Sequence, residues 1–152
     1  MAEPRDRATR TRDALALLST PAIDAWVATA SASGVPHLVP LSLLWTGEHA
    51  VVAVAESSLT ARNLRASGAA RLGVGPTRDV VMIDVRLEDV VPVDESAALG
   101  ESYAAKADWD PRGVPGYVFL VLRPQRVQAW REVNEMTGRT LLRGGTWSER
   151  NP

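Results

Sequence analysis

Residues 51–74, VVAVAESSLTARNLRASGAARLGV, carry the local signals that decide the fold. The segment opens with a short apolar run rich in valine, which predicts a strand buried on both faces. Ser57 or Ser58 can then cap a helix, and Gly68 can provide its left-handed end. The sequence therefore predicts a helix over residues 59–67, between two strands.

Polar residues gather at the start of this predicted helix. Thr60, Arg62 and Asn63 fall within its first turns, close to Ser58. A helix start presents unpaired N–H groups and a partial positive charge, and a hydroxyl and a guanidinium add to its attraction for a phosphate ester. The same residues can also simply cap and solvate a surface helix, and the pattern alone leaves both interpretations open.

The composition indicates a single domain. The chain has 152 residues, of which 45% are hydrophobic, enough to build one core. We expect residues 1–10 to be disordered and residues 11–152 to form the domain. A net charge of −1 argues against general nucleic-acid or membrane binding, and a chain without cysteine has no disulfide or zinc–thiolate site. The N-terminus lacks the apolar segment of a secretory signal, so we expect a cytoplasmic protein.

Alternating apolar residues predict a mainly β (α+β) fold with antiparallel strands. The six predicted strands cover residues 23–30, 35–45, 51–54, 70–75, 80–93 and 117–130. Short helices are expected at residues 11–19 and 59–67 and, after a cap at Asp94, up to residue 107. Proline cannot donate to a sheet, so the strand with Pro36 and Pro40 is expected at an edge or bulged near Pro40, with free backbone groups at Leu41 and Ser42.

The C-terminal segment from Trp130, WREVNEMTGRTLLRGGTW, is unusually apolar for the end of a chain. It contains Leu141, Leu142 and Trp147, which must pack against something. A second subunit and the chain's own sheet are both suitable surfaces, and the sequence does not choose between them.

The sequence shows no familiar catalytic or metal-binding motif. His37 and His49 stand in neither an HxH nor an HExxH arrangement, which leaves a zinc site without support. The GxSxG, Walker and GxGxxG patterns are absent. The remaining options are a binding module or an enzyme whose reactive atom belongs to a bound cofactor, so no catalytic residue is assigned.

Three segments resemble the pyridoxamine 5′-phosphate oxidase-related superfamily of FMN-binding split β-barrels, and in particular its small flavin or deazaflavin oxidoreductases. They are WVATASASGVPHLVPLSLLW (26–45), SLTARNLRASGAARLGV (58–74) and VQAWREVNEMTGRTLLRGGTW (127–147). These segments are spread along nearly the whole chain from Leu15 onward. The resemblance implies a six-stranded antiparallel split β-barrel with short peripheral helices, which forms a homodimer with cofactor sites at the interface.

The resemblance also assigns a cofactor site. The phosphate-binding positions of the family correspond to Ser58, Thr60, Arg62 and Asn63, and many relatives carry lysine where this chain has Thr60 and Arg62. The ring system would lie along two strands, at Pro40, Leu41 and Ser42 and at Val52, Ala53 and Val54. A tryptophan and an arginine of the C-terminal part, here Trp130 and Arg139, would complete the partner's site.

These resemblances imply an FMN- or deazaflavin-dependent oxidoreductase that transfers hydride to or from a small planar substrate. The alternative is a non-catalytic split-barrel protein that carries or senses flavin or haem, with His37 or His49 as a haem ligand. A third interpretation is a structural barrel without cofactor. We expect a homodimer with a small-molecule substrate and with no nucleic-acid, membrane or metal partner.

Overall fold

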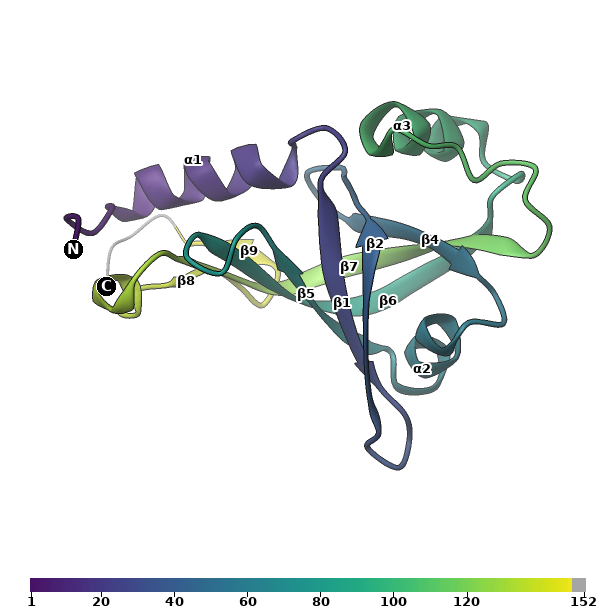
Figure 1. Cartoon of the computed structure of the whole chain (residues 1–152), viewed down its shortest axis with the longest axis horizontal. Coiled ribbons are helices and arrows are strands. Elements are labelled where there is room, and N and C mark those ends of the chain that lie inside the picture. Colours follow the sequence, from purple (N-terminus) through teal and green to yellow (C-terminus); the bar gives the residue numbers. More distant parts are fainter. Residues whose placement is uncertain (149–152) are drawn as a thin grey trace.

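The computed structural model describes residues 1–148 as one coiled antiparallel sheet with three α-helices at its periphery (Figure 1). The strands follow in the order β2-β1-β5-β6-β7-β4-β3, with β8 paired to β7 and β9 to β8. Their bounds are β1 Asp24–Ala30, β2 Pro36–Ser42, β3 Leu44–Trp45, β4 Ala50–Ala55, β5 Ala69–Val74, β6 Val80–Pro92, β7 Tyr117–Trp130, β8 Thr140–Arg143 and β9 Thr146–Trp147. The helices are α1 Arg7–Leu18, α2 Leu59–Ser67 and α3 Ala97–Ala107, and a 3-10 turn covers Val133–Glu135.

The mainly β class and the six long strands are confirmed, with three differences. The predicted strand 35–45 is divided into β2 and β3, because the buried Leu43 separates a segment paired with β1 from one paired with β4. Pro40 lies opposite Trp26 in an unbroken register, so β2 tolerates its prolines as an edge strand and not through a bulge. The C-terminal part adds β8 and β9 beyond the six.

The coiling of the sheet brings its two ends together. β2 is the first strand of the order and β4 is next to last, yet β2 and β4 are in contact. Inward-facing side chains of the long strands fill the space between them, among them Val27, Leu72, Ile83, Leu120 and Val127. α2 packs against β1 and β4 at this closure, and its Leu64 is part of the same core. The arrangement is that of a split barrel.

The caps of α2 are those predicted from the sequence. The hydroxyl of Ser58 accepts a hydrogen bond from the amide of Ala61 at 3.2 Å. Gly68 ends the helix with a φ of 72°, a conformation that glycine adopts without strain.

The third helix begins later than expected. The side chain of Ser96 caps α3 by accepting from the amide of Leu99, while the carboxylate of Asp94 accepts from the amide of Gly113 in the loop that precedes β7. Asp94 therefore stabilises a long-range loop contact, which the local sequence does not reveal.

The prediction of disorder for residues 1–10 is wrong. α1 begins at Arg7 after a cap at Asp6, whose carboxylate accepts from the amide of Thr9 at 2.8 Å. Arg5 forms an ion pair with the buried Glu135 at 2.8 Å, and the Arg10 guanidinium donates to the backbone carbonyl of Glu135. These partners lie far away in the sequence, so composition alone could not reveal that the segment is ordered.

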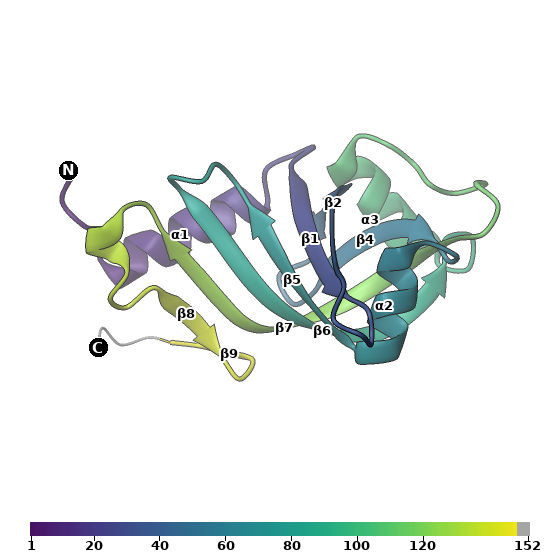
Figure 2. The same cartoon turned by 60° about the horizontal axis from the view of Figure 1, so that its bottom comes forward.

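The C-terminal segment folds back onto its own chain. β8 pairs with β7, and Leu141 and Leu142 enter the main core with Trp147 packed beside them. These residues therefore need no second subunit to be buried. N-terminal α1 and C-terminal β8 lie at the same end of the molecule, and α2 lies at the other (Figures 1 and 2). Within the described residues, no helix combines the length and the apolar character needed to cross a membrane.

We predict that Glu135→Gln lowers the free energy of unfolding by about 3 kcal/mol at pH 7, because it removes the buried partner of Arg5. The hydrogen bond from Arg5 is the main cause that lowers the pKa of Glu135 from its ordinary 4.5 to about 2. A lowered pKa stabilises the folded chain above about pH 4.5, and this contribution is lost as the pH falls toward 2. Urea denaturation at pH 7 and pH 3 measures both effects.

Glu132→Gln is the matched control, because Glu132 pairs with Arg78 at 2.9 Å on the surface. Its effect is expected to stay below about 1 kcal/mol. The assigned role of Glu135 would be contradicted if both variants lost the same free energy of unfolding. It would also be contradicted if the destabilisation by Glu135→Gln were as large at pH 3 as at pH 7.

Candidate functional site

The structure brings three of the predicted site segments together. Pro40, Leu41 and Ser42 lie at the end of edge strand β2, and Val52, Ala53 and Val54 lie on β4, which contacts β2. α2, which follows β4 after a short turn, packs against β4 and β1. We call this region, formed by the end of β2, the outer edge of β4 and the start of α2, the α2 site.

The first turn of α2 offers hydrogen-bond donors. Ser58 engages the amide of Ala61, whereas the amides of Leu59 and Thr60 have no partner among the described residues. Arg62 is exposed, and its guanidinium forms no ion pair or hydrogen bond within residues 1–148. Arg65, one turn further on, is bound to Glu56 at 2.7 Å. Arg62 is therefore the free cation at this helix start.

Two other predicted phosphate-binding residues serve the packing of α2. The buried amide of Asn63 donates from Nδ2 to the hydroxyl of Thr29 on β1 at 3.1 Å. Thr60 is 2% exposed, so its side chain also faces the protein. In this conformation, neither side chain is available to a ligand. The groups that can meet an anion at this helix start are the amides of Leu59 and Thr60 and the guanidinium of Arg62.

The predicted residues of β4 are also buried. Val52 and Val54 belong to the main core, and Ala53 faces a second cluster beneath α3. β3 pairs with β4 only at residues 50 and 51, so the outer edge of β4 beyond them carries no strand among the described residues. β4 can therefore contact a ligand through its backbone edge, not through these side chains.

The end of β2, the strand at the other edge of the sheet, is held in place by α3. The Tyr103 hydroxyl donates to the carbonyl of Ser42, and the Lys106 ammonium donates to the carbonyl of Leu43, both at 3.0 Å. Burial raises the pKa of Tyr103 to about 12, so the phenol stays a donor at neutral pH, and burial lowers the pKa of Lys106. These two bonds fix the backbone where β2 ends. The sequence did not identify either residue as part of a site.

The two C-terminal site residues lie elsewhere. The Arg139 guanidinium lies 5.8 Å from the centre of the Trp130 ring, a cation–π contact, and its Nη1 donates to the carbonyl of Met136. Both residues belong to the β7–β8 end of the molecule, opposite α2 in Figures 1 and 2. Within one chain, Trp130 and Arg139 are therefore not part of the α2 site.

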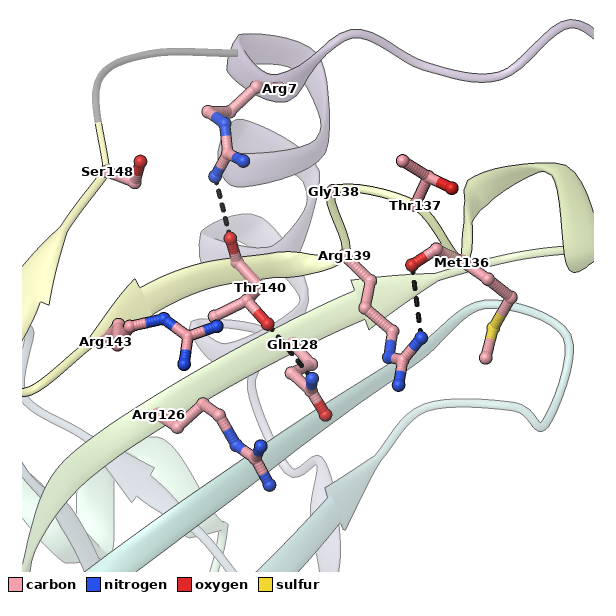
Figure 3. A pocket seen from close by; sticks show the side chains of 10 residues that line it. All are labelled: Arg7, Arg126, Gln128, Met136, Thr137, Gly138, Arg139, Thr140, Arg143 and Ser148. Atoms are coloured by element: carbon pink, nitrogen blue, oxygen red, sulfur yellow. Dashed lines mark hydrogen bonds between the residues drawn. The ribbon is translucent and has the colours of Figure 1, made fainter. Parts of the chain in front are cut away.

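Arg139 instead lines a pocket of about 560 Å³ between α1, β7 and β8 (Figure 3). We call it the tail pocket. Its walls are formed by Arg7, Arg126, Gln128, Met136, Thr137, Gly138, Arg139, Thr140, Arg143 and Ser148.

A second region missed by the sequence analysis is apolar and exposed. Trp26 of β1 is 54% exposed and Leu38 of β2 is 60% exposed, and with Gly73 and Met82 they line a pocket of about 340 Å³ on the outer face of the sheet. The strand alternation already places Trp26 on the side opposite the core residues, and this was the available signal.

The described residues offer no grouping of three or more histidine and carboxylate side chains that could hold a metal ion. His49 is engaged with Glu88, which Arg123 also contacts.

The sequence of residues 16–131 matches the family model of pyridoxamine 5′-phosphate oxidase. The chain belongs to this family. The match begins inside α1 and ends just beyond β7, so it includes the α2 site and excludes β8 and β9. A comparison with curated proteins found no match.

Solved structures share the family fold. An F420 reductase is 23% identical, with a TM-score of 0.63, over 74% of this chain and 93% of that one. General Stress Protein 26 from Bacillus anthracis is 12% identical, with a TM-score of 0.64, over 80% and 94%. HupZ from Group A Streptococcus is 21% identical, with a TM-score of 0.55, over 72% and 86%. At these identities the likeness shows the fold alone.

Proposed function

We propose that the chain is an FMN- or deazaflavin-dependent oxidoreductase that transfers hydride to or from a small planar substrate. The observation that carries this proposal is the unpaired Arg62 beside the free amides of the α2 start, next to two strand edges. Family membership and the fold shared with an F420 reductase support it.

The residues at the α2 site fit an anionic cofactor. The amides of Leu59 and Thr60, with the guanidinium of Arg62, would hold its phosphate. The backbone from Pro40 to Ser42, held by Tyr103 and Lys106, would orient the ring. When bound, a flavin supplies the hydride chemistry itself, so the protein needs to bind, orient and shield it. Because the cofactor supplies the reacting atoms, no acid–base pair is needed at the site.

We propose that the functional form is a homodimer. A solvent-exposed tryptophan beside an exposed leucine is typical of an interaction surface, and Trp26 and Leu38 occupy one face of the sheet. Trp130 ends β7 and Arg139 precedes β8, at the end of the molecule opposite α2, so we propose that they complete a site on a second copy. Two-fold pairing is the commonest way to cover such a face.

The alternative function is a carrier that binds a flavin without turnover. It is favoured by the lack of a free acid or base at the α2 site among the described residues, since Glu56 and Lys106 are both engaged. Mixing the loaded protein with a reduced nicotinamide cofactor or a reduced deazaflavin separates the two functions. An oxidoreductase shows substrate-dependent reoxidation, whereas a carrier shows none.

We predict saturable binding of FMN or a phosphate-bearing deazaflavin, measured by fluorescence titration of the purified chain. Arg62→Ala should weaken FMN binding about tenfold or more and riboflavin binding only slightly, because riboflavin lacks the phosphate that Arg62 would contact. Arg65→Ala is the control, since it removes the same charge from the same helix but from a side chain already paired with Glu56.

Equal losses of FMN and riboflavin affinity in Arg62→Ala would remove the phosphate assignment. If neither FMN nor a deazaflavin binds the wild-type chain, the proposed function is wrong.

The dimer is tested separately. Trp26→Asp is expected to convert a dimer into a monomer in light scattering, because it buries a charge in the proposed apolar interface. Val114→Asp makes the same kind of change at an exposed apolar residue in the α3–β7 loop and should leave the dimer intact. A monomeric wild-type chain, or a Trp26→Asp chain that stays dimeric, would overturn this interface.

A further inference from the structure

The tail pocket concentrates positive charge. Four of its lining residues are arginines, Arg7 from α1, Arg126 from β7, Arg139 from the turn before β8, and Arg143 from β8. Figure 3 shows the guanidinium groups of Arg126, Arg139 and Arg143 arranged around Gln128 and Thr140. No carboxylate is among the lining residues.

The charges of the pocket are poorly balanced within the described part of the chain. Arg7, Arg139 and Arg143 form no ion pair there, and only Arg126 is bound to a carboxylate, that of Asp84 at 2.7 Å. Asp84 also pairs with Arg71, so its single negative charge is shared between two guanidinium groups. Hydrogen bonds from these arginines keep the pKa of Asp84 lowered although burial acts to raise it. The pocket therefore keeps an excess of positive charge.

Two local features indicate that this excess serves a ligand. Arg126 and Arg143 stand directly opposite each other in the β7–β8 register, and like charges in that position destabilise a strand pair. The Nε atom of Arg7 is buried and has no hydrogen-bond partner among the described residues, which leaves a strong donor unsatisfied. An oxyanion between Arg126 and Arg143 would relieve their repulsion, and the unsatisfied Nε of Arg7 adds to the uncompensated positive charge beside them.

The pocket walls are held before any ligand arrives. The Arg7 guanidinium donates to the carbonyl of Thr140 at 2.7 Å, and Gln128 donates to the Thr140 hydroxyl at 3.0 Å. The Arg5–Glu135 pair ties the segment before α1 to the turn before β8. Side chains fixed in this way lose little further entropy when a ligand binds.

We infer that the tail pocket binds a small organic or inorganic molecule with two or more phosphate or carboxylate groups. Guanidinium groups suit both kinds of oxyanion, since each presents parallel N–H donors. A volume of about 560 Å³ suits a small ligand, and the net charge of −1 gives no extended field for a nucleic acid. This binding function goes beyond the redox proposal; of the pocket's arginines, only Arg139 is also assigned to the cofactor site of a second copy, and Arg7, Arg126 and Arg143 are not.

The test is a calorimetric titration of the full chain, without flavin, with tripolyphosphate and with citrate at constant ionic strength. Saturable binding of tripolyphosphate alone identifies a phosphate site, and binding of citrate alone identifies a carboxylate site. Arg143→Gln is the variant of choice, because its guanidinium makes no bond within the described residues and its loss should not disturb the fold. We expect this variant to lower the affinity for the anion about tenfold and to leave FMN binding at the α2 site unchanged.

Arg12→Gln is the matched control, an equal change of charge at an arginine of α1 that is exposed outside the pocket. Arg62→Gln should leave anion binding intact, so a failure of the α2 site and a failure of the tail pocket are distinguishable. The inference is overturned if neither anion binds saturably, if Arg12→Gln weakens binding as much as Arg143→Gln, or if a random oligonucleotide binds more tightly than both anions.

Discussion

The structure depends on one constraint, which is that the two edges of an open antiparallel sheet carry backbone groups without a neighbouring strand. β2 carries Pro36 and Pro40, which cannot donate to a further strand, and β4 is covered by β3 at only two residues. Coiling brings these two edges together instead of exposing them, and α2 covers the junction. Unpaired backbone groups, a helix start and the free Arg62 thus meet at one place, and this is the place where an anionic cofactor can be held without catalytic side chains.

The end of the molecule opposite α2 is organised by charged side chains. The buried Glu135 draws Arg5 and Arg10 toward the turn before β8, and this fixes α1 against the C-terminal strands. The same packing places Arg7 beside Arg139 and Arg143 in the tail pocket. One carboxylate thus orders a segment rich in arginine, while the nearby Arg7, Arg139 and Arg143 form no ion pair within residues 1–148. The two anion sites that we propose therefore lie at opposite ends of the molecule and depend on different features, backbone amides at one and arginine side chains at the other.

Local signals in the sequence were sufficient for the fold but only partly for the site. Alternation and the caps Ser58 and Gly68 predicted α2 and its flanking strands, because each depends on neighbouring residues. The prediction that Arg62 lies near the start of this helix rests on the same neighbouring residues. The burial of Asn63 through Thr29 and the ordering of Arg5 by Glu135 depend on partners 34 and 130 positions away, which periodicity cannot reveal. The tail pocket likewise forms only because folding brings Arg7 of α1 to the backbone of Thr140 in β8.

The central claim is that an anionic flavin docks at the start of α2, between the edges of β2 and β4. Hydrogen–deuterium exchange of the purified chain, measured with and without FMN, tests it most directly. Slower exchange of the amides at residues 41–43 and 59–62 on addition of FMN is the result that we predict. Saturating FMN that leaves these amides unchanged and protects only residues 126–143 would place the cofactor at the other end of the molecule and contradict the account.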